Sequence, residues 1–483
     1  MRPGAIPGRE DHDNYRPKTL RGALAQSLLL PEDLSASRRN TLRKWLILGL
    51  LFIAIAAAFY MVPRTTLLTL QVVFWFFFAM VIAWRFALLV AALVSRVEDS
   101  VDEVPLRDDL PVYSVLVAVR HEANMMAQLG RNLSALDWPA DKLDVIILVE
   151  ADDPGTVEAA HAAAFPAGTR ILIVPPGTPM TKPRALNFGL AHAEGDFITI
   201  YDAEDRPDPQ QLKAALQAFD AGGPGVVCVQ APLVATNGSH GWLPAHWALE
   251  YRVQFGIFVR ALARLAYPVM LGGTSNHFRR RDLIAIGAWD AWNVTEDADL
   301  GIRIARMGGF TAGIDLPTYE AGPRRLNVWL AQRSRWIKGY MQTWLVAMRS
   351  PARLLRELGT MRWISVNLTL GGALLSSVLY GPMSVMVFLG LAFDLVPLDA
   401  ISFGIFGMGW LVGFLTDVSA PGKWTFSRCL AIATRPLYWP LHTLAAVKAV
   451  YGLAVRPSFW AKTPHQPDEK ERGAPWHSGS SPS

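Results

Sequence analysis

The chain has 483 residues, of which 51% are hydrophobic and 18% are charged, with a formal net charge of +5. Seventeen tryptophans and this apolar fraction are unusual for a purely soluble protein, and the length allows one large domain with additional segments. Two cysteines exclude a disulfide framework and a cysteine-based metal site, and no feature of the sequence indicates nucleic-acid binding.

A polar, Arg-rich leader, residues 1–44, precedes two apolar runs. Residues 45–62 and 67–94 contain one charged residue, Arg85, and each run matches the roughly 20 residues that cross a hydrocarbon core. No small-residue cleavage site precedes the first run, so it is not a cleaved signal peptide. We therefore expect residues 45–95 to form two membrane helices.

Basic residues indicate on which side of the membrane these helices begin. The last seven positions of the leader hold four basic residues, whereas the connector between the two runs holds only Arg64. Positive charge collects on the cytosolic side of membrane helices, where it faces anionic lipid. We expect the leader and residues 96–362 to lie in the cytosol.

Short apolar runs alternate with helical stretches after residue 110. This pattern predicts an α/β domain over residues 96–325, with a mostly parallel sheet covered by helices and inserted between the membrane segments. In such sheets ligands bind beyond the carboxyl ends of the strands. The runs are residues 111–120, 143–153, 169–175, 196–205 and 225–231.

Acidic residues end three of these runs. Because neighbouring parallel strands end at one edge of the sheet, we expect their carboxylates to converge on one crevice. The cluster would repel itself unless cations neutralised it, and a hard divalent ion with oxygen ligands, Mg²⁺ or Mn²⁺, would do so. Each carboxylate alone could instead belong to a solvated loop or a helix cap. The residues are Glu122, then Glu150, Asp152 and Asp153, and then Asp202, Glu204 and Asp205.

Lys182 lies in TKPRALNFGLAHAEGD (181–196), directly before a predicted helix with an apolar face. Its ammonium group could meet a phosphate, or it could be a surface lysine.

The segment NVTEDADLGIRIARMGGF (293–310) begins with acidic residues and continues as a helix. Thr295 suits the N-cap position, and Glu296, Asp297 and Asp299 in the first turn would complement the helix dipole. A carboxylate here could also remove a proton from a substrate. Both roles are compatible if Glu296 and Asp299 serve the helix while Asp297 points into the crevice.

An amphipathic helix is predicted over NVWLAQRSRWIKGYMQTW (327–344), within a juxtamembrane region of residues 326–362. It could lie in the membrane interface with its tryptophans at headgroup depth. Alternatively, Trp336 could offer an apolar platform to a sugar ring, while Gln332 and Arg335 supply hydrogen-bond donors.

A C-terminal membrane region follows at residues 363–457. Its first segment could be one tilted helix or a hairpin that turns at Gly381-Pro382, which gives three or four crossings. Three crossings would leave the tail outside unless residues 431–455 lie in the interface.

The tail, residues 458–483, is polar and rich in Pro, Gly and Ser beyond residue 462, which predicts disorder. Its first part, SFWAKTPH (458–465), could be an interfacial Trp and Lys.

Five motifs occur in an order that resembles glycosyltransferase family 2, in particular its membrane-embedded, processive branch, which includes bacterial cellulose synthase and related exopolysaccharide synthases. The resemblance extends over about residues 111–346 and implies a GT-A-type catalytic domain. SFWAKTPH resembles, faintly, the gating loops of such synthases. The five motifs are VAVRHEA (117–123), KPRALN (182–187), YDAEDRPDP (201–209), VTED (294–297) and QRSRW (332–336).

The resemblance implies roles for individual residues. Asp297 would be the general base for an acceptor hydroxyl. Asp202 would ligate the metal with Glu204, which stands at the second Asp of the usual Asp-x-Asp, although Asp205 competes with it. The nucleotide would contact Glu122, Glu150, Asp152, Lys182 and Asp202. The acceptor or the diphosphate would contact Glu296, Asn276, His277, Gln332, Arg335 and Trp336, although His277 could be an ordinary loop histidine.

The implied function is inverting, metal-dependent transfer from a UDP-sugar to a growing exopolysaccharide at the cytosolic face of a bacterial inner membrane. The polymer would pass through the membrane helices. Accessory secretion subunits could be further partners. The alternative within the family is transfer of one sugar to a membrane lipid. A membrane scaffold or transporter with a nucleotide-binding domain is the non-enzymatic alternative.

Overall fold

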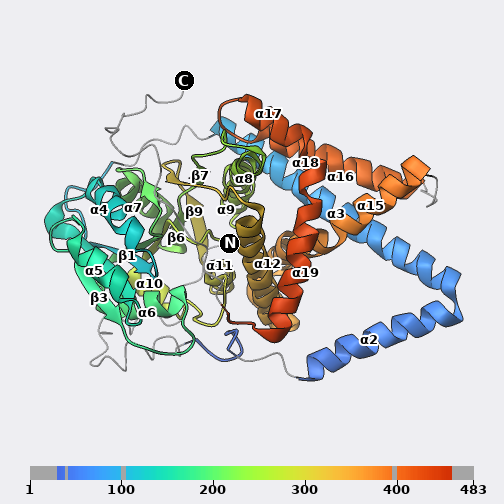
Figure 1. Ribbon diagram of the computed structural model, residues 1–483, viewed down its shortest axis with the longest axis horizontal. Helices are drawn as coiled ribbons and strands as arrows, with labels where there is room; N and C mark the ends of the chain where they lie inside the picture. Colours follow the sequence, from blue (N-terminus) through green and yellow to red (C-terminus); the bar gives the residue numbers. More distant parts are fainter. Residues whose placement is uncertain (1–29, 38–41, 99–104, 394–399, 460–483) are drawn as a thin grey trace.

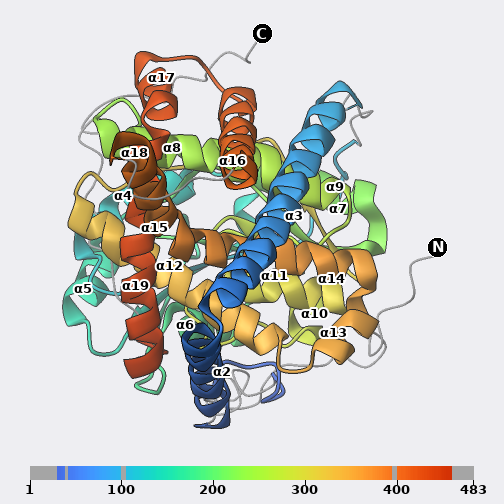
Figure 2. The same ribbon diagram turned by 90° about the vertical axis from the view of Figure 1, so that its right-hand side faces the viewer.

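The computed structural model describes residues 30–37, 42–98, 105–393 and 400–459. Figure 1 shows an α/β domain on one side of the molecule and a group of long helices on the other. Figure 2, turned by 90°, shows the long helices in front of the α/β domain.

A seven-stranded sheet forms the centre of the α/β domain. Its strands are β1 (Tyr113–Val119), β2 (Leu143–Glu150), β3 (Arg170–Val174), β4 (Phe197–Tyr201), β6 (Val226–Gln230), β8 (Asn276–Arg279) and β9 (Phe310–Gly313). Their order across the sheet is β3-β2-β1-β4-β8-β6-β9. Only β8 runs antiparallel to its neighbours, so the predicted mostly parallel sheet is confirmed.

A smaller sheet of three strands lies beside the first. It consists of β5 (Arg206–Pro207), β7 (Leu233–Ala235) and β10 (Thr318–Glu320), with β10 in the middle. β5 begins four residues after Asp202, so this sheet fixes the chain that leaves the end of β4.

Two hydrophobic cores cover the two faces of the large sheet. Val115 and Val117 of β1 enter one core, whereas Leu116 enters the other. Because both faces are buried, the strands read as nearly continuous apolar runs. The first core is closed by α4 (Met126–Ser134), α5 (Pro154–Ala162) and α7 (Gln211–Gly222), and the second by α6 (Lys182–His192), α8 (Trp242–Val253), α11 (Glu296–Arg306) and α12 (Leu326–Ala347).

Shorter elements connect these layers. The helix α8 continues through a π-helical turn, η5 (Gln254–Val259), into α9 (Arg260–Arg264). The remaining ones are α10 (Arg280–Ala285), α13 (Pro351–Leu358) and the 3₁₀ turns η2 (Ala123–Met125), η3 (Ala140–Lys142) and η4 (Gly223–Gly225).

Within the described residues, three helical stretches are long and apolar enough to cross a membrane: Pro63–Val94, Thr360–Gly390 and Ala400–Ser419. They correspond to α3 (Pro63–Glu98), to α14 (Thr360–Val366), η6 (Asn367–Gly371) and α15 (Gly372–Phe393) in series, and to α16 (Ala400–Ser419). A further apolar helix, α2 (Leu42–Met61), precedes α3. Pro382 lies inside α15, so the chain does not turn back at Gly381-Pro382.

The last helices contact both the α/β domain and the long apolar helices. They are α17 (Phe426–Ala433), α18 (Arg435–Tyr438) and α19 (Pro440–Val455). α19 contacts α12 and α15, and in Figure 1 it runs beside α12 and crosswise to α15 and α16. The expected disorder of the tail, and most of SFWAKTPH, lie outside the described residues.

Candidate active site

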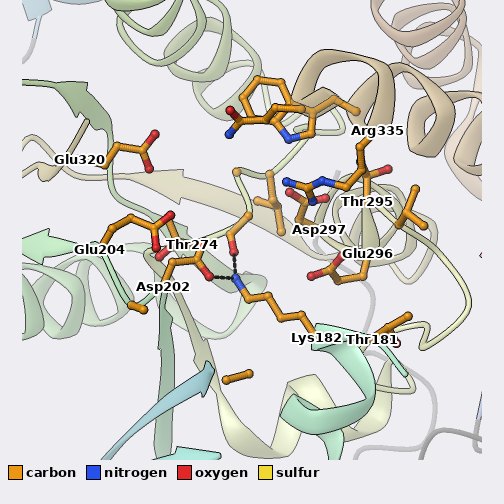
Figure 3. A pocket seen from close by; sticks show the side chains of 18 of the residues that line it. Thr181, Lys182, Asp202, Glu204, Thr274, Thr295, Glu296, Asp297, Glu320 and Arg335 are labelled. Atoms are coloured by element: carbon orange, nitrogen blue, oxygen red, sulfur yellow. Dashed lines mark hydrogen bonds and ion pairs between the residues drawn. The ribbon is translucent and has the colours of Figure 1, made fainter. Parts of the chain in front are cut away.

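A cavity of about 270 Å³ opens at the carboxyl ends of the parallel strands. Its wall combines the ends of β1, β2 and β4, the loop before β8, the first turn of α11 and one face of α12. Figure 3 shows acidic and basic side chains from these elements pointing toward one another.

The strand ends bring four of the predicted carboxylates to this cavity. β1 pairs with β2 on one side and with β4 on the other, and all three run in the same direction. Residues that follow these strands therefore meet at one edge. Those that line the cavity are Glu122, Glu150, Asp202 and Glu204.

The three acidic residues at the end of β2 lie in different environments. The carboxylate of Glu150 accepts a hydrogen bond from Arg184 Nη2 at 2.6 Å, and both side chains are buried. Burial raises the pKa of Glu150 despite this arginine. Asp153 caps α5 by accepting from Thr156 N at 3.3 Å. Asp152 is 44% exposed, pairs with Arg120 at 2.7 Å and does not line the cavity, so its predicted contact with the nucleotide is not supported.

Lys182 lies inside the cavity and is not a surface lysine. Its side chain is 12% exposed, and its Nζ donates hydrogen bonds to Asp202 Oδ1 and, at 2.8 Å, to the carbonyl oxygen of Gly273. Burial alone would lower the pKa of Lys182, but Asp202 and Glu296 outweigh it and raise that pKa. The ammonium group is therefore a fixed positive charge.

Asp205 lies behind the cavity wall and supports the segment that carries Asp202 and Glu204. Its Oδ2 accepts from Asp202 N at 2.7 Å and from the Thr274 hydroxyl, and the side chain is fully buried. Burial, together with the charges of Asp202 and Glu204, raises the pKa of Asp205 well above its usual value. Of the competing carboxylates, Asp202 and Glu204 line the cavity and Asp205 does not.

Asp202 and Glu204 suit a hard divalent cation, because both offer carboxylate oxygens on one wall of the cavity. No group of three or more His, Cys, Asp or Glu side chains within the described residues could hold a metal ion by itself. Mg²⁺ is commonly bound by one or two carboxylates together with substrate phosphates. The residues therefore fit an ion that arrives with a diphosphate.

The acidic residues in the first turn of α11 lie in two environments, one within the helix packing and the other at the cavity. Asp299 pairs with Arg303 at 2.7 Å, and both side chains are buried. Thr295 occupies the N-cap position, but its side chain makes no capping hydrogen bond. Glu296 and Asp297 both line the cavity. Asp297 and Glu296 are thus both available to a ligand in the cavity, whereas Asp299 is held within the helix.

Burial raises the pKa of both Asp297 and Glu296. The pKa of Asp297 rises to about 6, although Ala298 N donates to its Oδ1 at 2.8 Å and Lys182 and Arg335 oppose the shift. The pKa of Glu296 rises further, because burial is reinforced by the neighbouring Asp297 charge. Of the two carboxyl groups, Asp297 has the lower pKa, which suits it better than Glu296 to accept a proton near neutral pH.

One face of α12 completes the cavity. Gln332, Arg335 and Trp336 line it, as their spacing of three and four residues along a helix requires. Trp329 of the same helix is fully buried, and its Nε1 donates to the hydroxyl of Tyr438 at 2.9 Å. Trp329 therefore does not lie at headgroup depth, whereas Trp336 on the same helix lines the cavity.

Asn276 and His277 do not line the cavity, which corrects the expected acceptor contact. His277 is fully buried in the sheet, 2.7 Å from the hydroxyl of Tyr113 and 3.3 Å from Gln211. Burial lowers the pKa of His277 to about 3, so the imidazole is neutral. The Nδ2 of Asn276 donates to the carbonyl oxygen of Gly272 at 2.6 Å and so holds the loop that does line the cavity.

Several cavity residues carried no recognisable signal in the sequence. They come from α8 and η5, from the loop before β8 and from β10, and only packing brings them to the site. They are Tyr251, Gln254, Phe255, Met270, Leu271 and Glu320.

Comparison with known proteins agrees with this geometry. Residues 111–339 match the family described as "Glycosyltransferase like family 2". Over this region the chain is similar to glycosyltransferase family 2. All five motifs lie within the matched region, and the chain spans about half the length of the first of the curated relatives that it matches.

Curated relatives cover the chain to different extents. It is 26% identical over 241 residues to a probable glycosyltransferase, YdaM, of Bacillus subtilis. This match covers 48% of this chain and 56% of the relative. It is 28% identical over 249 residues to cellulose synthase 2 of Novacetimonas hansenii, but only 15% of that protein is covered. With beta-monoglucosyldiacylglycerol synthase of Synechocystis sp. it shares 25% identity over 374 residues, 74% of this chain and 75% of that one.

A solved structure supports the fold. The mannosyltransferase PcManGT from Pyrobaculum calidifontis, in complex with GDP-Man and Mn²⁺, superposes with a TM-score of 0.51 and 19% identity. The match covers 78% of this chain and 99% of the other. The fold is therefore of the GT-A type, with a mostly parallel sheet.

Proposed function

We propose that this enzyme transfers a sugar from a UDP-sugar, with inversion and with the help of Mg²⁺ or Mn²⁺, to a growing exopolysaccharide at the cytosolic face of the membrane. One observation carries the proposal: Asp297, the pair Asp202 and Glu204, and the QRSRW residues Gln332, Arg335 and Trp336 line the same cavity. A base, a place for a metal-bound diphosphate and an apolar platform for a sugar ring thus lie together.

Direct displacement accounts for the chemistry without a covalent intermediate. Asp297 takes the proton of the acceptor hydroxyl while that oxygen forms a bond to the anomeric carbon and the bond from that carbon to the diphosphate oxygen breaks. The electron pair of the broken bond leaves with UDP. A divalent ion held by Asp202 and Glu204 would neutralise the charge that develops on this leaving group.

Basic residues can stabilise the same negative charge. The Lys182 ammonium already contacts Asp202, and Arg335 lies across the cavity from it in Figure 3. Preorganised cations aimed at developing charge are a large source of transition-state stabilisation. Glu122 and Glu150 would contact the nucleoside, since they line the cavity at the neighbouring strand ends.

Transfer of a single sugar to a membrane lipid is the second candidate. The match covers 75% of the beta-monoglucosyldiacylglycerol synthase of Synechocystis sp., but only 15% of cellulose synthase 2 of Novacetimonas hansenii. That difference in coverage favours the lipid acceptor, while the residues of the QRSRW face suit either acceptor. Accessory secretion subunits and passage of a polymer through the membrane helices stay predictions.

We also propose a topology with the catalytic domain and the end of α19 on the cytosolic side of a bacterial inner membrane. α2 and α3 would cross outward and back, and α15 and α16 would do the same. α19 is 16 residues long and lies beside α12, which supports an interfacial position for it. An even number of crossings then returns the chain to the cytosol.

Radiolabelled UDP-sugars added to membranes with Mg²⁺ or Mn²⁺ test the function. We expect one sugar to be incorporated by the wild type, and Asp297→Asn to reduce incorporation by about 10²–10⁴-fold, the usual contribution of a general base. A distribution of long, glycosidase-sensitive chains would support polymer synthesis, and one organic-soluble product would support the lipid acceptor. Equal incorporation by both proteins would reject Asp297 as the base.

A further inference from the structure

Arg333, the second residue of QRSRW, lies among three indole rings. Its guanidinium carbon is 4.9 Å from the centroid of Trp336, 4.9 Å from that of Trp247 and 5.4 Å from that of Trp329. Trp336 also packs on Trp247, with ring centroids 5.0 Å apart. Trp336 lines the cavity, but Trp247, Trp329 and Arg333 do not. The position of the Trp336 ring therefore depends on residues behind the cavity wall.

Glu250 of α8 holds this guanidinium in place. Its Oε2 accepts hydrogen bonds from Arg333 Nη2 and, at 2.8 Å, from the hydroxyl of Tyr438. Its Oε1 lies 3.2 Å from His442 Nε2. Within the described residues, the Nε of Arg333 has no hydrogen-bond partner, so Glu250 supplies the polar anchor of this side chain.

The pair is largely buried and charged. The side chains of Arg333 and Glu250 are 14% and 18% exposed. Burial would raise the pKa of Glu250, but Arg333 and His442 outweigh it and hold that pKa well below its usual value. A buried ion pair of this kind contributes little net stability compared with apolar residues of the same size, although breaking it is costly. Stability alone thus gives a weak reason for the pair.

We propose that Glu250 is a positioning residue for the transfer reaction: through Arg333 it fixes the Trp336 indole in the orientation that receives the acceptor sugar. A cation stacked on an indole restricts the ring to the plane that the cation faces, and the carboxylate restricts the cation. Since Trp336 would contact the acceptor, loss of Glu250 should impair transfer and leave the nucleotide site unchanged. This inference rests on the proposed glycosyl transfer.

Glu250→Gln tests the proposal, because it removes the charge and keeps the side-chain length. The measurements are the dissociation constant for UDP with Mn²⁺ and the incorporation of the sugar that the wild type uses. We expect the UDP constant to stay within about twofold and incorporation to fall about tenfold, a change typical of a coupling between contacting residues. Glu357→Gln is the matched control, since Glu357 also pairs with an arginine, Arg306, at 2.6 Å, but lies away from the cavity.

A double-mutant cycle with Trp336→Phe separates positioning from a general structural role. If Glu250 acts through Trp336, Glu250→Gln should reduce incorporation in the wild-type background and have little further effect in the Trp336→Phe background. The same reduction in both backgrounds, or wild-type incorporation by Glu250→Gln, would overturn the proposal. A rise in the UDP constant equal to the loss of incorporation would do so as well.

Loss of folding is addressed by a second variant. Should Glu250→Gln leave the buried Arg333 charge without a partner and prevent folding, the neutral pair Glu250→Gln/Arg333→Met takes its place in the same cycle. Reduced incorporation with unchanged UDP affinity supports the proposal for this variant too, and wild-type incorporation contradicts it. If the wild-type protein transfers from no UDP-sugar, the proposed function itself fails, which is a separate result.

Discussion

The ammonium group of Lys182 and the carboxylate of Asp202 form a direct ion pair inside the cavity, and the carbonyl oxygen of Gly273 accepts a second hydrogen bond from the same nitrogen at 2.8 Å. The carboxylate of Asp202, one of the two expected metal ligands, is thus paired with a cation of the protein. A diphosphate that enters with its metal ion meets a site with a positive charge in place.

Replacing Lys182 should weaken use of the donor. In Lys182→Gln the diphosphate loses a charged hydrogen-bond donor, and a hydrogen bond to a charged group contributes about 1.5–3 kcal/mol. We expect kcat/KM for the UDP-sugar to fall roughly ten- to hundredfold. Lys213→Gln serves as the control, because Lys213 pairs with the half-exposed Asp137 away from the cavity and should not affect the donor. Similar kinetics of both variants would contradict a role for Lys182 at the diphosphate.

The rate of transfer should depend on the protonation of Asp297. A base must be ionised, and burial raises the pKa of this carboxyl to about 6. We expect transfer to be independent of pH above that value and to fall about tenfold per unit below it. Removal of Lys182 takes away a charge that lowers the pKa of Asp297, so the acidic limb of the profile should move to higher pH in Lys182→Gln. A limb that stays in place would show that another group titrates.

Removal of the divalent ion should abolish transfer. After treatment with EDTA we expect no incorporation, and added Mn²⁺ should restore it. Asp202→Asn and Glu204→Gln should each raise the Mn²⁺ concentration for half-maximal rate at least tenfold, because even outer-shell partners of a metal contribute about 10–100-fold. Asp208→Asn is the control within the same motif, since Asp208 lies outside the cavity and accepts from Gln210 N at 2.9 Å. Full activity in EDTA would refute the metal dependence.

The regular part of the site could be predicted from the sequence. Buried runs predict parallel strands, and parallel strands place the residues that follow them at one edge, which is where Glu122, Glu150, Asp202 and Glu204 lie. The same reasoning does not fix which way an individual side chain turns within a strand end. Asp152, two residues after Glu150, faces solvent and Arg120 instead of the cavity.

The part of the site that lies outside the strand ends could not be predicted, because it depends on packing between segments that are distant in the sequence. His277 follows a loop that lines the cavity, but on β8 its side chain turns into the sheet, where successive side chains alternate between faces. Glu250 and Tyr251 on α8 belong to an ordinary hydrophobic helix in the sequence. In the structure Glu250 contacts α12 and α18, and the hydroxyl of Tyr251 donates to Glu320 of β10 at 2.6 Å, contacts that the helix pattern does not predict.

His277 should therefore affect stability and not catalysis. His277→Ala removes the partner of the buried Tyr113 hydroxyl and leaves a space in the sheet, at a cost of about 1–3 kcal/mol for an unsatisfied buried group. We expect a Tm several degrees lower and an unchanged KM for the UDP-sugar at temperatures well below Tm. Gln332→Ala, which alters the cavity wall, should show the reverse pattern. A raised KM with an unchanged Tm in His277→Ala would restore the acceptor role.

Asp290 should control how firmly residues 30–37 are attached to the loop that leads into α11. Its carboxylate accepts from the Ser35 hydroxyl at 2.9 Å, from Ala36 N at 2.6 Å and from Trp292 N at 3.1 Å. Asp290→Ala leaves these donors without their acceptor, so hydrogen exchange of residues 30–37 should become faster. Transfer should also slow, because the same loop leads into the first turn of α11, which carries Glu296 and Asp297. Arg353→Ala breaks ion pairs of a largely exposed arginine to Asp33, at 2.8 Å, and to Glu357, at 2.7 Å, and should change exchange little, since such pairs contribute about 0–1 kcal/mol. Equal exchange in the two variants would show that Asp290 is not the anchor.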